Sequence, residues 1–133
     1  MLSFVTKLKE ILEEKYPVTI TWEQNFISET KPELVIIPGT ENREMTSLQG
    51  SGSSLTISVY YYDFWSPEVE LKRFKELEKI VNTLETDNRI LELVVKKPVT
   101  SFGAEAIKEN EDSFTGLFVG AIEIKVTERR RRE

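Results

Sequence analysis

Two stretches of the chain carry apolar residues at the spacing of an amphipathic α-helix. In residues 2–15 the apolar side chains recur at helical spacing, with lysine and glutamate between them. The apolar positions are Phe4, Val5, Leu8, Ile11 and Leu12. Pro17 disfavours helical geometry at the residue before it, so this helix is expected to end at Tyr16.

The second helix is expected to start at Ser66. The sequence Ser66-Pro67-Glu68 provides a capping side chain, a proline at the first helical position and a negative charge in the first turn. The expected apolar stripe of this helix is Leu71, Phe74, Leu77, Val81 and Leu84. The helix should end by Asp87-Asn88, where helix-breaking residues follow the stripe.

Other segments have the alternation or the short apolar runs of β-strands. Val18, Ile20 and Trp22 alternate with threonines, and residues 34–37 form an apolar run that predicts a strand buried on both faces. Residues 54–62 are expected to form a strand with one face in the core and Tyr60 and Tyr62 on the opposite face. The expected core positions of this strand are Leu55, Ile57, Val59 and Tyr61.

The second half of the chain predicts one weak and two clearer strands. Residues 90–97 are expected to form a strand before Pro98, and residues 117–127 form the strongest strand pattern in the chain. In that last strand Ile122, Ile124 and Val126 should point inward, and Glu123 and Lys125 outward. Residues 98–114 are expected to be mostly loop, with a short strand over 100–106 as the alternative.

The elements follow the order α-β-β-β-α-β-(β)-β, which predicts an α+β fold. We expect a single, mainly antiparallel sheet with the two helices packed on one face, against the strands at 54–62, 90–97 and 117–127. Residues 39–53 are polar and glycine-rich, so a long, mobile connection is expected there. Residues 1–128 then form a single domain, followed by the charged tail 129–133.

Composition narrows the chemistry open to this chain. It has 133 residues, of which 39% are hydrophobic and 31% charged, as in globular proteins. It contains neither cysteine nor histidine. Disulfides, thiolate ligands and Ser–His or Cys–His catalysis are therefore excluded within the chain, and the commonest metal ligand is missing. We expect a protein that is not an enzyme and that needs no cofactor or metal.

The charge distribution argues against nucleic acid as a specific partner. The net charge of the chain is -5. Residues 128–133 (ERRRRE) carry a charge of +2, so the rest of the chain carries -7. An acidic body lacks the excess of lysine and arginine over acidic residues with which nucleic-acid-binding proteins neutralise phosphates. The N-terminal segment lacks the uninterrupted apolar region of a signal peptide, and no run is long enough to span a membrane. The protein is therefore expected to remain in the compartment where it is synthesised.

Three groups of carboxylates are candidates for acid–base or cation sites: Glu13 with Glu14, Glu109 with Glu111 and Asp112, and Asp63. None has the spacing of a known motif, so we interpret them as solvated surface charges. Residues 50–54 (GSGSS) resemble a phosphate-binding loop, but a strand follows them and the lysine of that motif is missing. A flexible connector is the better interpretation.

Two features are candidates for contacts with partners. The aromatic cluster Tyr60, Tyr61, Tyr62, Phe64 and Trp65 fits a stacking platform, core packing or a subunit contact. Because Tyr60 and Tyr62 lie on the face away from the helices, they are interface candidates. The C-terminal arginines, beginning with Arg129 and Arg130, fit contact with DNA, an acidic neighbour or a membrane surface, or only a solubilising end.

Several segments together resemble one protein family. An amphipathic N-terminal helix is followed by ELVIIPGTENRE, a polar connection into SLTISVYYYD, a helix after Ser66-Pro67 and the terminal strand GLFVGAIEIKVTE. This arrangement resembles the tail terminator (tail completion, minor capsid) proteins of long-tailed bacteriophages across nearly the whole chain. The resemblance lies in element order, size and texture, and it includes no diagnostic motif.

The resemblance implies an α+β subunit that forms a ring, commonly a hexamer, on the head-proximal end of the tail tube. Such a ring stops tube growth and presents a surface to head-completion or neck proteins, while DNA passes through without specific binding. It implies a place in the tail or neck of the virion after assembly in the host cytoplasm, and no catalytic residue. Carried over to this chain, the 39–53 segment would reach a neighbouring subunit or the tail tube, with Arg43, Glu44 and Gln49 as contact candidates.

Two alternatives remain open from the sequence. One is a small cytosolic module that binds a ligand or a protein without catalysis, in an apolar pocket between helices and sheet. The other is an enzyme that relies on carboxylates alone, which would need two convergent acids that the sequence does not place together.

Overall fold

The structure is a computed structural model that describes residues 2–22, 32–45, 51–112 and 114–128. Its element order is α1 (Leu2–Leu12), β1 (Val18–Ile20), β2 (Glu33–Met45), β3 (Ser51–Trp65), α2 (Glu70–Thr86), α3 (Asn88–Leu91), β4 (Val99–Lys108) and β5 (Gly116–Glu128). The strands form one sheet in the order β1-β2-β3-β5-β4. Only the β1–β2 pair is parallel. The predicted α+β fold with a mainly antiparallel sheet is confirmed.

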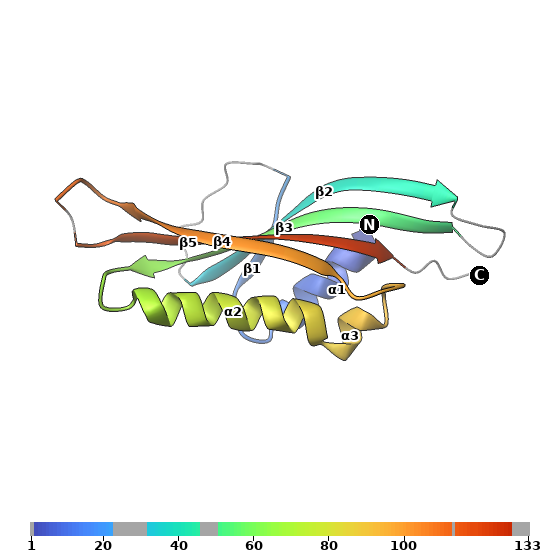
Figure 1. The fold of residues 1–133 in the computed structure, drawn as a ribbon, viewed down its shortest axis with the longest axis horizontal. Helices are drawn as coiled ribbons and strands as arrows, with labels where there is room; N and C mark the ends of the chain where they lie inside the picture. The colour runs from blue at the N-terminus through green and yellow to red at the C-terminus, as the bar shows by residue number, and fades with distance from the viewer. Residues whose placement is uncertain (1, 23–31, 46–50, 113, 129–133) are drawn as a thin grey trace.

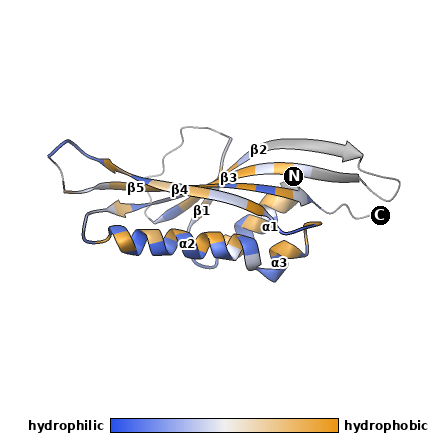
Figure 2. Ribbon diagram, in the orientation of Figure 1, coloured by the Kyte–Doolittle hydropathy of each residue, from blue (hydrophilic) through white to orange (hydrophobic). Residues whose placement is uncertain are grey.

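The helices cover one face of the sheet (Figure 1). The main core lies between them and that face, which confirms the predicted packing against the strands at 54–62 and 117–127. The third strand of that prediction, at 90–97, is not formed, and β2 contributes Leu34 and Ile36 to the core instead. Its fully buried members from the helices include Phe4, Val5, Leu8, Leu77 and Leu84, and those from the sheet include Leu34, Ile36, Leu55, Ile57, Val59, Tyr61, Phe118 and Ile122. Figure 2 shows hydrophobic and hydrophilic residues alternating along α2, as an amphipathic helix requires.

Close contact between α2 and β5 requires a glycine at position 120. A Cβ built on Gly120 would lie 2.6 Å from Cδ1 of Leu77, which is itself fully buried. Because a real Cβ does not approach another carbon so closely, only glycine lets the helix sit at this distance from the strand.

The alternation predicted for the central strands is confirmed. Leu55, Ile57, Val59 and Tyr61 are buried on the helix side of β3, and Ile122, Ile124 and Val126 on that side of β5. The run 34–37 is buried on both faces, because its even positions join the main core and Val35 and Ile37 join a second cluster with Tyr62.

The longest predicted connection is in large part a strand pair. β2 continues to Met45 and β3 starts at Ser51, with pairing that includes Glu44 opposite Gly52. The prediction of a long loop at 39–53 is therefore wrong for residues 39–45 and 51–53, which belong to strands. Residues 46–50 lie outside the described residues. The connector assigned to residues 50–54 is likewise wrong for 51–54, which belong to β3.

In the second half of the chain one predicted strand is absent and one alternative is confirmed. The strand expected at 90–97 is instead the end of α3 and a turn, with one isolated bridge from Val94 to Glu128. The alternative strand at 100–106 is present as β4 and is longer than expected.

Other predicted boundaries shift by a few residues. α1 ends at Leu12, and α2 begins at Glu70, without a side-chain cap from Ser66. In the predicted α2 stripe Leu71 and Phe74 are exposed, and Ile80 is buried instead. Trp22 lies after β1 and is exposed.

Candidate interaction surfaces

The sheet face opposite the helices, hereafter the back face, carries an apolar cluster. The cluster consists of Val35, Ile37, Tyr60, Tyr62, Leu117 and Val119. The strand registers bring these residues together, because Tyr60 pairs with Val35 and Tyr62 with Val119. Residues directly opposite each other in paired strands point to the same face, so this surface spans β2, β3 and β5.

The predicted interface residues Tyr60 and Tyr62 are in this cluster and stack on each other. Their ring centroids are 6.2 Å apart, with planes 20° from parallel. Tyr60 is half-buried and Tyr62 is buried. Burial raises the pKa of the Tyr62 hydroxyl above its ordinary value. Tyr60 is thus the member of the pair with surface left for a partner.

Sequence reasoning missed Glu33, which is buried beside this cluster at the start of β2. Thr19 donates a hydrogen bond to its Oε1, and Oε2 has no hydrogen-bond partner in the described part of the chain. The sequence contains a weak signal for it. Glu33 precedes the apolar run 34–37 and alternates with Val35 and Ile37, which places it on the same face.

The other predicted contact residues are only partly placed. The backbones of Arg43 and Glu44 belong to β2, paired with Ser53 and Gly52, and their side chains lie outside the described residues. Gln49, Arg129 and Arg130 lie outside the described residues altogether. The structure therefore does not bring the seven candidates into one site.

Asp63 is not the solvated charge that was expected. It is buried at the end of β3, where its Oδ2 accepts a hydrogen bond from the Tyr61 hydroxyl at 2.6 Å. The same oxygen lies 3.3 Å from a guanidinium nitrogen of Arg73 on α2. Burial, and secondarily the hydrogen bond to Asp63, raise the pKa of Tyr61 well above its ordinary value. This network ties the strand to the helix.

The pair Glu13 and Glu14 is exposed, as expected, but both residues have partners. Glu13 pairs with Lys9 one helical turn away. Glu14 accepts two hydrogen bonds from Arg89, which also binds Asp87 at 2.9 Å. Hydrogen bonds from Arg89 lower the pKa values of the Glu14 and Asp87 carboxyl groups. In return, the two carboxylates raise the pKa of the Arg89 guanidinium. The arrangement links the end of α1 to the start of α3.

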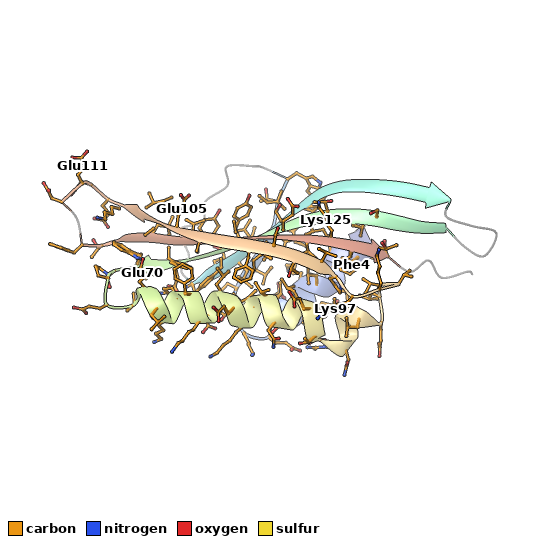
Figure 3. All side chains as sticks on the ribbon, viewed as in Figure 1. Phe4, Glu70, Lys97, Glu105, Glu111 and Lys125 are labelled. Atoms are coloured by element: carbon orange, nitrogen blue, oxygen red, sulfur yellow. The ribbon has the colours of Figure 1, made fainter. Side chains whose placement is uncertain are left out.

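The third group, Glu109, Glu111 and Asp112, lies exposed in the turn between β4 and β5. Figure 3 shows Glu111 at the far end of this hairpin, beyond the start of α2. These three carboxylates form no ion pair with any residue that the structure describes. Their exposure confirms the expectation that they are solvated surface charges.

A small pocket lies between the end of α1 and α2. Its volume is about 200 Å³, and its walls include Leu12, Tyr16, Ile80, Thr83 and Arg89. Within residues 2–22, 32–45, 51–112 and 114–128, no three acidic side chains converge to hold a metal ion. None of the described helices is long and apolar enough to cross a membrane.

Comparison with known proteins finds similar solved structures but no match in sequence. No protein-family model and no curated protein matches the chain. A similar solved structure is a chain from an entity titled "Virion of native gene transfer agent (GTA) particle", with 9% sequence identity and a TM-score of 0.40. The match covers 95% of this chain and 92% of that chain. At this TM-score the likeness establishes neither a common fold nor a function.

Proposed function

We propose that this chain is a structural assembly protein of a phage-like virion, a tail terminator that forms a ring, closes the tail tube and mediates head–tail joining. In this role it works through contacts between subunits and with neighbouring virion proteins, without catalysis. The resemblance in element order supports the class of protein. One structural observation carries the assembly mode, namely the two different open edges of the sheet.

The first open edge is β4, a ten-residue strand that pairs only with β5 among the described residues. The second is the outer side of β2. There β1 covers only Leu34 to Ile36, which leaves residues 37–45 without a strand beside them in the described part of the chain. Unpaired edges are templates for another chain. Since the two edges differ, pairing one with the other is heterologous, and such contacts close into rings when the rotation permits.

The test is tube capping by the purified protein, followed by electron microscopy of isolated tail tubes. Rings at tube ends and arrested tube growth are the expected result. A ring that assembles on the tube as its template leaves a monomer in solution, so a free monomer is compatible with the proposal. A protein that never binds a tube end, at any ratio, would overturn it.

A matched pair of variants tests the edge itself. Gly103→Lys places a charge in the middle of β4, where a new Cβ meets no atom within 4 Å, and should abolish capping because charged residues block edge pairing. Asn82→Lys adds the same charge on the exposed side of α2 and should cap normally. Equal capping by both variants would exclude β4 from the contact.

The second candidate is a binding module without catalysis, and the pocket between α1 and α2 is the observation that favours it. Its volume of about 200 Å³ is below the roughly 300 Å³ at which ordinary ligand pockets begin. Native mass spectrometry distinguishes the two functions. A small molecule retained in stoichiometric amount would favour the binding module.

A further inference from the structure

The β4–β5 hairpin presents an apolar row on the back face, close to its turn. Ile107 pairs with Leu117, and Leu117 pairs with Phe64 on β3, so the three side chains form one cross-strand row. Ile107 is 48% exposed and Phe64 60%. Phe114, in the turn itself, is 79% exposed. Exposed apolar residues that gather in this way typically mark a contact surface.

Carboxylates surround this row on the hairpin. Glu105 lies two residues from Ile107 on the same face, and Glu109, Glu111 and Asp112 lie in the turn. All four are exposed, and none has an ion-pair partner within the described residues. We call Glu105, Ile107, Glu109, Glu111, Asp112, Phe114 and Leu117 the hairpin surface. A partner for it should combine positive charge with flat groups that stack on aromatic rings.

The chain itself carries such a segment. Residues 129–132 are four consecutive arginines, and a guanidinium group both pairs with carboxylates and stacks on aromatic rings. Its aliphatic stem can also cover apolar side chains. The same chain therefore carries two complementary parts. The arginines match the carboxylates of the hairpin surface in charge, and their stems and guanidinium groups can pack on its apolar side chains.

The two cannot meet within one molecule. The arginines follow Glu128, the last residue of β5, and the hairpin surface lies at the start of the same strand. The 13 residues of β5 span about 40 Å at roughly 3.3 Å per residue. Four further residues reach at most about 14 Å when fully extended. Figure 1 shows the hairpin turn and the end of β5 at opposite ends of the molecule.

We propose that the arginine segment 129–132 of one copy docks on the hairpin surface of the next copy. The contact is heterologous, since it joins the two ends of the chain's last strand, and it therefore propagates from copy to copy as ring formation requires. This contact rests on the proposed function only because the contact and the ring both require copies of this chain to associate. It assigns a role to the arginines, for which the resemblance supplies none.

A binding measurement with a labelled peptide tests the contact without requiring a ring. The peptide copies residues 124–133, and its fluorescence anisotropy is followed as full-length protein is added. In that protein the four arginines are replaced by glutamate, so that its own tails do not compete. Saturable binding that weakens with added salt is expected, because screening reduces attraction between exposed charges.

Matched variants of the same protein locate the binding site. Glu109→Lys with Glu111→Lys should weaken peptide binding by roughly tenfold, since several exposed ion pairs are lost at once. Glu78→Lys with Glu92→Lys makes the same change in net charge at exposed positions elsewhere and should leave binding within about twofold. Phe114→Ala should weaken binding, and Val95→Ala, at another exposed apolar residue, should not.

Equal weakening by both charge variants would mean that the arginines sense only the net charge, and would overturn the proposal. Absence of peptide binding would also overturn it. The peptide-binding result and the tube-capping result test the two proposals separately. Peptide binding at the hairpin without capping would remove the proposed function and leave this contact standing, whereas normal capping by the hairpin variant would remove this contact alone.

Discussion

Gly120 shows how a single residue sets the distance between α2 and β5. Gly120→Ala is expected to destabilise the protein by about 1–3 kcal/mol, because the new methyl group overlaps the buried side chain of Leu77. Gly103→Ala is the matched control, since its Cβ meets no atom within 4 Å and should leave stability nearly unchanged. Urea denaturation of the three proteins measures the difference, and equal midpoints would contradict the close approach.

Tyr61 leads to a prediction about alkaline pH. Its folded-state pKa is raised by burial and by the hydrogen bond to Asp63, so the folded protein retains a proton that the unfolded chain loses near pH 10. The contribution of Tyr61 to the free energy of unfolding is therefore constant below about pH 10. Above about pH 10 this contribution falls, by at most about 1.4 kcal/mol per pH unit.

Denaturation between pH 8 and pH 12 measures this slope, using Tyr61→Phe as the comparison. The variant should lose part of the slope and keep the part due to Tyr62, whose pKa is raised in the same direction. Identical slopes in the two proteins would show that Tyr61 ionises freely. The variant also lacks the hydrogen bond to Asp63, so its stability at pH 8 should be lower.

At the residue scale, alternation predicted which β3 and β5 side chains enter the core, because burial of one sheet face imposes a period of two. The same pattern gives the face on which Asp63 and Glu33 lie, but it could not predict that these carboxylates are buried. A lone carboxylate in a strand resembles a solvent-facing residue, and Arg73, which pairs with Asp63, lies on another element. Partners distant in sequence decide whether such a charge can be buried.

The short helix α3 shows where element prediction reaches a limit. Residues 90–97 are rich in apolar and β-branched residues, which favours a strand, but a short apolar run has no period that separates strand from helix. The deciding contact is local. The Asp87 side chain accepts a hydrogen bond from the backbone N–H of Arg89 and caps the helix, and Ile90 then enters the core.

Removal of this cap should be measurable. Asp87→Ala is expected to destabilise the protein by about 1 kcal/mol, because the first turn of α3 loses its acceptor. Asp87→Asn keeps an acceptor and should recover most of that loss, although it weakens the ion pair with Arg89. Thermal unfolding of both variants separates the cap from the charge, and equal loss in both would assign the effect to the ion pair.

Strands that leave the core are the other elements that sequence could not locate. β4 is exposed along nearly its whole length, so no alternation is imposed on it. The ends of β2 and β3 pair with each other as far as Met45 and Ser51, and their polar residues read as a loop. β4 and the outer part of β2 are also the open edges of the sheet among the described residues.

At the scale of the whole molecule, the two open edges make a specific prediction about how copies meet. β4 of one copy should lie beside β2 of the next, rather than beside another β4. Because the chain has no cysteine, introduced cysteines can report this contact without background. Suitable positions are Ser101 on β4 and Asn42 on β2, both within the open edges.

With Ser101→Cys alone, oxidation of the assembled protein should give few cross-links, since two β4 strands do not meet. With Asn42→Cys and Ser101→Cys in one chain, it should give a ladder of products whose largest member equals the number of subunits in the ring. The ladder, read on a denaturing gel, thus measures ring size. Dimers formed efficiently by the single variant would instead indicate a two-fold β4–β4 contact, which closes after two copies and cannot build a ring.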